Sequence, residues 1–283
     1  MISLDAATVL LQWSIGGLFF LWVTSRHRVV GIGYGWLLRS TFGVMAAGGV
    51  AIGMAFNTVP LREVAGAGVV LATVVALVVS VVRRRAGVAG ERDQQQRRSA
   101  RVSAMTGIDR QADDVDETVP EFPPVLDLIA PAIGVVALVA AGIDAGGNSA
   151  VALLRIFAGA VFLGAVTDAM LLGHWYLVQP GLARQPIHEL NGWLAVSWPF
   201  EVGALLLPTG MLSVLSGSID DGYGGLLGWF WVACAVTTIV LSFVTKAALK
   251  ERQYAAVMAA TGLLYLAILT AFGTDLVARA VLA

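Results

Sequence analysis

Eight long apolar stretches, separated by polar connections, dominate this chain of 283 residues. A helix needs about 20 mostly apolar residues to cross a bilayer. Helices also satisfy the backbone of a continuous apolar stretch within lipid, whereas the strands of a membrane barrel would alternate. We therefore expect an all-α, polytopic membrane protein with eight transmembrane helices. The predicted spans are Ala6–Thr24, Leu38–Asn57, Val64–Val82, Leu126–Ile143, Ala150–Leu172, Leu190–Leu215, Leu226–Val244 and Tyr254–Gly273.

The composition agrees with a membrane location. Hydrophobic residues make up 58% of the chain and charged residues only 13%, whereas soluble domains are about 25% charged. The net charge of −1 gives no reason to expect a nucleic-acid partner. Only Lys246 and Lys250 among the 18 basic residues are lysine. This arginine bias, with abundant Ala, Val and Gly, favours a GC-rich bacterium, so we expect a bacterial cytoplasmic membrane protein.

The basic residues also predict the orientation of the chain. If both termini lie outside, 15 of the 18 basic residues fall on the cytoplasmic side, and only Arg62, Arg155 and Arg279 fall outside. The positive-inside rule therefore places both termini outside.

One long polar connection, residues 83–124, divides the predicted spans. Its first part is rich in arginine and its second part is acidic. Such a composition is typical of a partly disordered loop, and Arg83–Pro124 is also a candidate docking segment for a cytoplasmic partner or anionic lipid. The predicted organisation is residues 1–82 with three spans, this loop, residues 125–148 with the fourth span, and residues 149–283 with four more.

Short motifs recur in the same order in the two halves, which predicts an internal duplication of a four-helix unit in parallel orientation. The matched pairs are Gly16-x-x-Phe19-x-x-x-Val23-Thr24 with Gly159-x-x-Phe162-x-x-x-Val166-Thr167, Gly35-Trp36-Leu37-x-x-Ser40 with Gly192-Trp193-Leu194-x-x-Ser197, Val78-x-Ser80-x-Val82-x-Arg84 with Val240-x-Ser242-x-Val244-x-Lys246, and Leu138-x-Ala140-x-Gly142-x-Asp144 with Leu269-x-Ala271-x-Gly273-x-Asp275.

Two carboxyl groups lie inside predicted spans, where an ionisable residue costs about 2.5–3.5 kcal/mol on insertion scales. Glu201 lies midway through the sixth span, just after Pro199, which frees a helical carbonyl. Asp168 lies near the cytoplasmic end of the fifth span. We expect these carboxyls to handle protons or a ligand, and the alternative is a glutamate that only locks helices together.

The predicted connection between the fifth and sixth spans carries a second polar group. His174, Arg184, His188 and Glu189 are the candidate ligand-handling residues there, near the cytoplasmic face. The aromatic residues of this segment are expected to be interfacial anchors, and they are Trp175, Tyr176 and Trp193. A quinone headgroup or a small anion fits this group better than haem or a metal, because the spacing of the histidines is not that of a metal site.

Three functions are compatible with these features. The first is a subunit of a redox or energy-transducing complex, with a quinone or proton-handling site near the cytoplasmic face and other membrane subunits as partners. The second is a proton-coupled transporter, and the third is a non-catalytic scaffold or assembly factor. The sequence does not establish an enzymatic activity.

Overall fold

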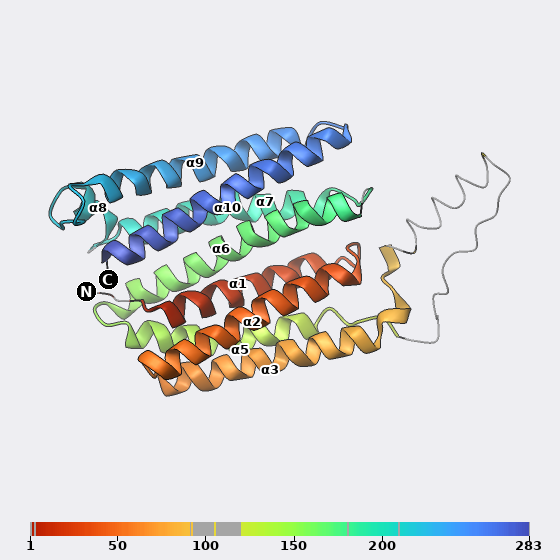
Figure 1. Ribbon diagram of the computed structural model, residues 1–283, viewed down its shortest axis with the longest axis horizontal. Helices are drawn as coiled ribbons and strands as arrows, with labels where there is room; N and C mark the ends of the chain where they lie inside the picture. Colours follow the sequence, from red (N-terminus) through yellow and green to blue (C-terminus); the bar gives the residue numbers. More distant parts are fainter. Residues whose placement is uncertain are drawn as a thin grey trace.

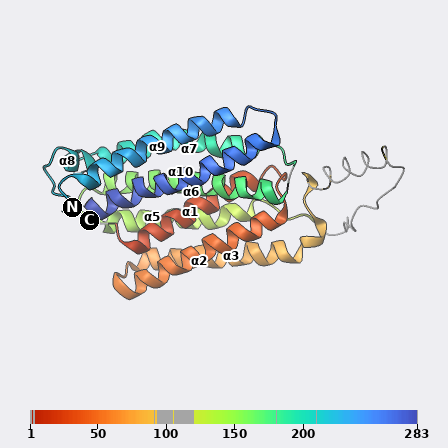
Figure 2. The same ribbon diagram turned by 45° about the horizontal axis from the view of Figure 1, so that its top comes forward.

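The computed structural model describes residues 2, 4–90, 92, 105, 120–179, 181–208 and 210–282. Within these residues the fold is helical and contains no strand. Eight long helices lie along one common axis (Figure 1), and the turned view shows the same elongated bundle (Figure 2). They are α1 (Ala6–Ser25), α2 (Ile32–Phe56), α3 (Pro60–Val82), α5 (Leu126–Asp144), α6 (Ser149–Val178), α7 (Gln185–Leu206), α9 (Leu226–Ala248) and α10 (Tyr254–Leu282).

Two short elements complete the described fold, namely η1 (Arg84–Ala86) and α8 (Met211–Leu215). Both chain termini lie at the same end of the bundle as α8, here called the terminal end. The connection over residues 83–124 leaves the opposite end, here called the loop end (Figure 1). Most of this connection, including residues 93–104 and 106–119, lies outside the described residues, so its predicted role as a docking segment stays a prediction.

Seven helices in the described part of the chain are long and apolar enough to cross a membrane. The expectation of an all-helical, multi-pass membrane protein is therefore confirmed at this level. The eighth long helix, α7, is the least apolar of the set, since it carries His188, Glu189, Asn191 and Glu201. Large apolar side chains, including Leu71 on α3 and Phe243 on α9, are exposed on the outside of the bundle, as expected for a surface that faces lipid.

Each half of the chain packs its helices in the same cyclic order. In the first half α1 contacts α2, α2 contacts α3, α3 contacts α5, and α5 returns to α1. In the second half α6, α7, α9 and α10 follow the same order. The two sets meet mainly where α1 crosses α6, and there Gly16 faces Ala160 so closely that an added Cβ would lie 1.8 Å from the Ala160 carbonyl oxygen.

The largest differences from the predicted spans are in α6, α7 and α10, and α2, α3 and α7 also begin four to six residues earlier than predicted. Helix α6 continues to Val178, so Gly173–Val178 is helical and not part of a connection. The predicted span Leu190–Leu215 is too long, because α7 ends at Leu206 and Met211–Leu215 forms the separate α8. Pro208, which has no backbone N–H, lies in this break. Helix α10 continues beyond Gly273 to Leu282.

A polar clamp fixes the terminal end of the first half. The Asp5 carboxylate caps α1 by accepting from the Thr8 backbone N–H at 2.8 Å. The same carboxylate accepts two bonds, of 2.9 and 2.8 Å, from Nη1 of Arg62 on α3. Arg62 also bonds Glu63, through Nε at 2.9 Å and Nη2 at 2.7 Å. This clamp ties the start of α3 to the start of α1.

Candidate functional site

A cluster of buried polar side chains lies between four helices in the terminal half of the bundle. Each of its five members is at most 8% exposed. They come from α1, α6, α7 and α10, and are Gln12, Arg155, Glu201, Asp275 and Arg279. Here this set is called the internal charge cluster. Two arginines and two carboxylates balance one another within it, which is the condition under which buried charge is tolerated.

A two-bond ion pair within the cluster joins Asp275 and Arg279, which lie one turn apart on α10. Nε and Nη2 of Arg279 donate to the two carboxylate oxygens of Asp275, each at 2.8 Å. Nη2 also donates to Oε1 of Gln12 at 2.7 Å, which links α10 to α1. The i, i+4 spacing places both ionic side chains on one face of the helix.

Gly159 makes the space that this contact occupies. A Cβ at Gly159 would lie 2.4 Å from Nε2 of Gln12, 3.0 Å from Nη2 of Arg279 and 3.1 Å from Oδ1 of Asp275. The glycine of α6 therefore forms one wall of the cluster, and a side chain there would displace its polar groups.

Arg155 connects the cluster to the end of α7. Its Nε donates to the Ala204 carbonyl and its Nη2 to the Leu207 carbonyl, both at 3.1 Å. The last carbonyls of a helix have no partner within the helix, and the break at Pro208 leaves those of α7 in this state. Arg155 therefore caps α7 from the side of α6.

Glu201 is fully buried beside these groups, and no described N–H or hydroxyl group donates to its carboxyl oxygens. The Asp275 carboxyl lies within hydrogen-bonding reach of it, so one proton can be shared between the two carboxyls. Its charged neighbours are Asp275, Arg279 and Arg155. Pro199 lies in the preceding turn, inside a helix that remains continuous from Gln185 to Leu206. The structure thus places the predicted Glu201 in a charged environment, beside a second carboxyl with which it can share a proton.

Asp168 occupies a separate position on α6, nearer the loop end. It is fully buried, and both carboxyl oxygens lack a hydrogen-bond partner in the part of the chain that the structure describes. The hydroxyl of Tyr34 donates to the backbone carbonyl of Asp168 at 3.3 Å. At 1.5 Å per residue, Asp168 lies about 20 Å along the helix from Arg155. The two predicted carboxyls therefore belong to different depths of the bundle.

The predicted group of His174, Arg184, His188 and Glu189 lies at the loop end, with its members in different surroundings. His174 Nδ1 contacts the Tyr265 hydroxyl of α10 at 3.2 Å, on an exposed face. Glu189 pairs with Arg26 and, at 3.1 Å, with Nε2 of His27. His188 is half-buried in the first turn of α7.

Arg184 has a clear structural role. Nη1 donates to the carbonyls of Leu249, at 3.3 Å, and Glu251. Nη2 donates to those of Arg252 and Gln253, at 2.8 and 3.0 Å. These four carbonyls form the turn between α9 and α10, so this guanidinium holds that turn against the start of α7.

The three predicted anchor aromatics make contacts within the bundle. Trp175 lies against Tyr34, with ring centroids 6.0 Å apart, and Tyr176 donates to the Ala183 carbonyl. Trp193 packs edge-on against Phe20 at 5.8 Å. Trp175 and Trp193 therefore join α6 and α7 to the first half of the chain at the loop end, whereas Tyr176 holds the connection between α6 and α7.

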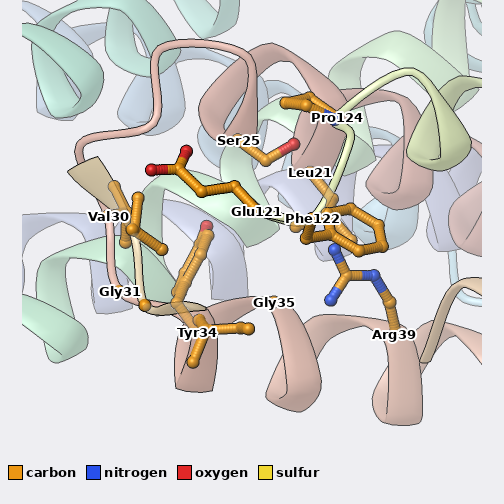
Figure 3. Close-up of a pocket in the computed structure, with 13 residues that line it drawn as sticks. Leu21, Ser25, Val30, Gly31, Tyr34, Gly35, Arg39, Glu121, Phe122 and Pro124 are labelled. Carbon is orange, nitrogen blue, oxygen red and sulfur yellow. The ribbon is translucent and has the colours of Figure 1, made fainter. Parts of the chain in front are cut away.

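A small cavity opens at the loop end, between α1, α2 and the two ends of the 83–124 connection. On one wall Arg39 forms a buried ion pair with Asp127, with Nε to Oδ1 at 2.7 Å and Nη2 to Oδ2 at 2.8 Å. Figure 3 shows Phe122 over the Arg39 guanidinium and the carboxylate of Glu121 on the opposite side. A second, smaller cavity of about 10 Å³ at the terminal end is lined by Arg155 and Arg279.

The sequence interpretation missed most of the internal charge cluster. Gln12 and Arg155 are isolated polar residues inside apolar stretches, and the Gly16–Gly159 match places them at equivalent positions. Asp275 and Arg279 have the i, i+4 spacing of a helical ion pair. Extending the last span by two turns would have identified them as buried.

The histidine, cysteine and carboxylate residues that the structure describes form no group of three suited to a metal ion. No protein-family model, curated protein or solved structure matches this chain.

Proposed function

We propose that this chain is a proton-coupled transporter of a bacterial cytoplasmic membrane, in which Glu201 exchanges the coupled proton. All eight long helices span the bilayer in this proposal, and both termini lie outside. The positive-inside rule supports this orientation, because the basic connections gather at the loop end and the termini at the other.

The proposal also includes a parallel duplication of a four-helix unit. The colinear motifs support it, and so does the cyclic packing order shared by α1–α2–α3–α5 and α6–α7–α9–α10. Transporters built from parallel repeats place their sites at the interface between repeats. The internal charge cluster fits that pattern, since α1 contributes Gln12 and the second unit contributes the four charged residues.

The observation that carries the proposal is the state of the Glu201 carboxyl. It is fully buried, no described N–H or hydroxyl group donates to either oxygen, and two arginines and a second carboxylate are its charged neighbours. A proton can be held between the carboxyls of Glu201 and Asp275, so Glu201 can gain or lose it with little rearrangement of the protein. Such a shared proton suits a group that must change its protonation during a transport cycle.

Two further features are compatible with this proposal. The terminal-end cavity, of about 10 Å³, has room for about one water molecule beside Arg155 and Arg279. Asp168 provides a second buried carboxyl nearer the loop end. A quinone site at His174, Arg184 and His188 receives less support, because Arg184 donates to four backbone carbonyls and His174 contacts Tyr265.

Proton flux into proteoliposomes tests this function when pools of candidate solutes are added in turn, because a coupled carrier moves protons only together with its substrate. Purified protein is reconstituted with a pH-sensitive dye inside, and a potassium diffusion potential drives protons inward. We expect a flux above that of empty liposomes, and about a hundredfold lower flux for Glu201→Gln, which keeps the shape of the side chain but cannot ionise. Glu251→Gln, at an exposed position, should behave as the wild type. Equal fluxes for wild type and Glu201→Gln would contradict the proposal.

A further inference from the structure

The cavity at the loop end combines one polar wall with apolar surroundings. Its volume is about 50 Å³. Leu21 and Ser25 line it from α1, Tyr34 and Arg39 from α2, and Phe122 from the end of the long connection (Figure 3). These residues are far apart in the sequence, so the fold assembles the cavity.

Arg39 presents an unused hydrogen-bond donor in this wall. The side chain is 3% exposed, and its Nε and Nη2 are occupied by Asp127. Its Nη1 is buried and has no hydrogen-bond partner among the described residues. Phe122 stacks 4.3 Å from the guanidinium carbon and closes one face. A buried donor on a charged group is costly to leave unsatisfied, so this nitrogen calls for an acceptor within the cavity.

The charges around the cavity favour an anion. Asp127 pairs with Arg39, while Glu121 pairs with Arg28 at 3.3 Å and with Arg92. The three arginines of these pairs outnumber the two carboxylates, so the group carries one positive charge in excess. The Glu121 carboxylate lies on the far side from Arg39 in Figure 3 and is already paired with two arginines, so it does not compete for Nη1.

The size of the cavity limits the ligand. One water-sized group needs roughly 10–15 Å³ of such space, so the cavity holds about four non-hydrogen atoms. Leu21, Val30 and Phe122 provide an apolar part of the wall that suits a short hydrocarbon group. Together these properties describe a small carboxylate with a short apolar end.

We propose that the loop-end cavity is a binding site for a small organic monocarboxylate, whose carboxylate accepts from Nη1 of Arg39. The site is separate from Glu201, so its failure or success is independent of proton transfer there. Glu121 and Phe122, at the end of the long connection, line the cavity, so a bound anion would also contact that connection.

Calorimetric titration of the full-length protein in detergent tests the site with acetate as the probe. Ethylammonium chloride, a cation of similar size, is titrated in parallel at equal ionic strength. The decisive variant is Gly35→Ala, because its Cβ would lie 2.6 Å from Nη1 of Arg39 and obstruct that nitrogen while the Arg39–Asp127 pair keeps its charges. The matched control is Gly192→Ala, at the equivalent position of the second half, where a Cβ meets nothing within 4 Å.

We expect acetate to bind wild type and Gly192→Ala alike, and Gly35→Ala to bind about tenfold more weakly, as expected for loss of one charge-assisted hydrogen bond. Val88 also lines the cavity, and Val88→Phe should weaken acetate binding by filling it. This variant replaces Gly35→Ala in the test if Gly35→Ala does not fold. Circular dichroism and gel filtration establish that each variant is folded. The proposal is overturned if wild type does not bind acetate, if ethylammonium binds as tightly, or if folded Gly35→Ala or folded Val88→Phe keeps wild-type affinity.

Discussion

Arg279 holds Asp275 through two hydrogen bonds of 2.8 Å inside a single helix, and both side chains are almost completely buried. The pair lies where sequence analysis placed the end of a membrane span and the outer surface. It instead anchors α10 to Gln12 of α1 and sets the charge beside Glu201.

Removing one member of this pair should destabilise the bundle strongly. Arg279→Gln leaves the Asp275 carboxylate buried without its cation, and we expect a loss of about 3–5 kcal/mol in the free energy of unfolding. Equilibrium unfolding in mixed micelles measures it. The double variant Asp275→Asn, Arg279→Gln should recover much of that loss, since no charge is then left unpaired. A single variant no less stable than the double one would contradict this.

The crossing of α1 and α6 should not tolerate a methyl group at Gly16. A Cβ there would lie 1.8 Å from the Ala160 carbonyl oxygen, so the two helices would have to separate. We expect Gly16→Ala to cost about 1–3 kcal/mol and to lower the melting temperature. Gly262→Ala is the control, because a Cβ there meets nothing within 4 Å, and its effect should be neutral or stabilising. Equal melting temperatures would count against a tight crossing.

Arg184 should stabilise the turn between α9 and α10. Arg184→Ala removes donors to four carbonyls, and we expect a loss of about 1–3 kcal/mol. Hydrogen exchange of residues 249–253 should become faster, with little change at the terminal end. Arg252→Ala, whose exposed side chain lies in the same turn, provides the comparison. Unchanged exchange in Arg184→Ala would show that these bonds do not hold the turn.

Acid should loosen the start of α9 through Asp221. Backbone N–H groups of Gly225 and Tyr223, followed by those of Gly228 and Leu227, donate to its carboxylate and lower its pKa below the ordinary value of 3.8. The unfolded chain therefore binds this proton at higher pH than the folded chain. The stabilisation is complete above about pH 4 and is lost as the pH falls through the lower folded pKa.

Melting temperatures between pH 7 and pH 3 measure this dependence. Asp221→Asn should be less stable than wild type at pH 7, and the difference should shrink towards pH 3. A constant difference across this range would exclude the ionised carboxylate as the cause.

The helical, multi-pass architecture follows from the sequence because apolar length is a strong signal. The ends of the helices are harder to predict, because a charged side chain marks the end of an apolar stretch even where the helix continues. Asp275 and Arg279 compensate each other at short range and therefore remain inside α10. At the other extreme, Pro208 interrupts an apolar stretch that hydropathy alone reads as continuous.

The candidate site was predictable only in part. Glu201 and Asp168 stand out as carboxyls in apolar sequence, and the structure places both in the interior. The charged neighbours of Glu201 come from other helices. Which side chains meet across helices depends on how each helix is rotated about its axis and shifted along it, and the sequence of one helix does not determine either. Arg184 illustrates the opposite case, because a basic residue among histidines suggests a ligand, whereas its four backbone acceptors lie over sixty residues away.

The low apolarity of α7 has a consequence for how the chain is made. Charged residues within a helix oppose its release from the insertion machinery into lipid. Helix α7 carries Glu201 in its last two turns and is not among the seven strongly apolar helices. The two arginines that compensate Glu201 are made at different times, because Arg155 is synthesised before α7 and Arg279 after it. In the proposed topology, helix α7 should therefore enter the bilayer stably only once α10 has been made, so a later helix governs the insertion of an earlier one.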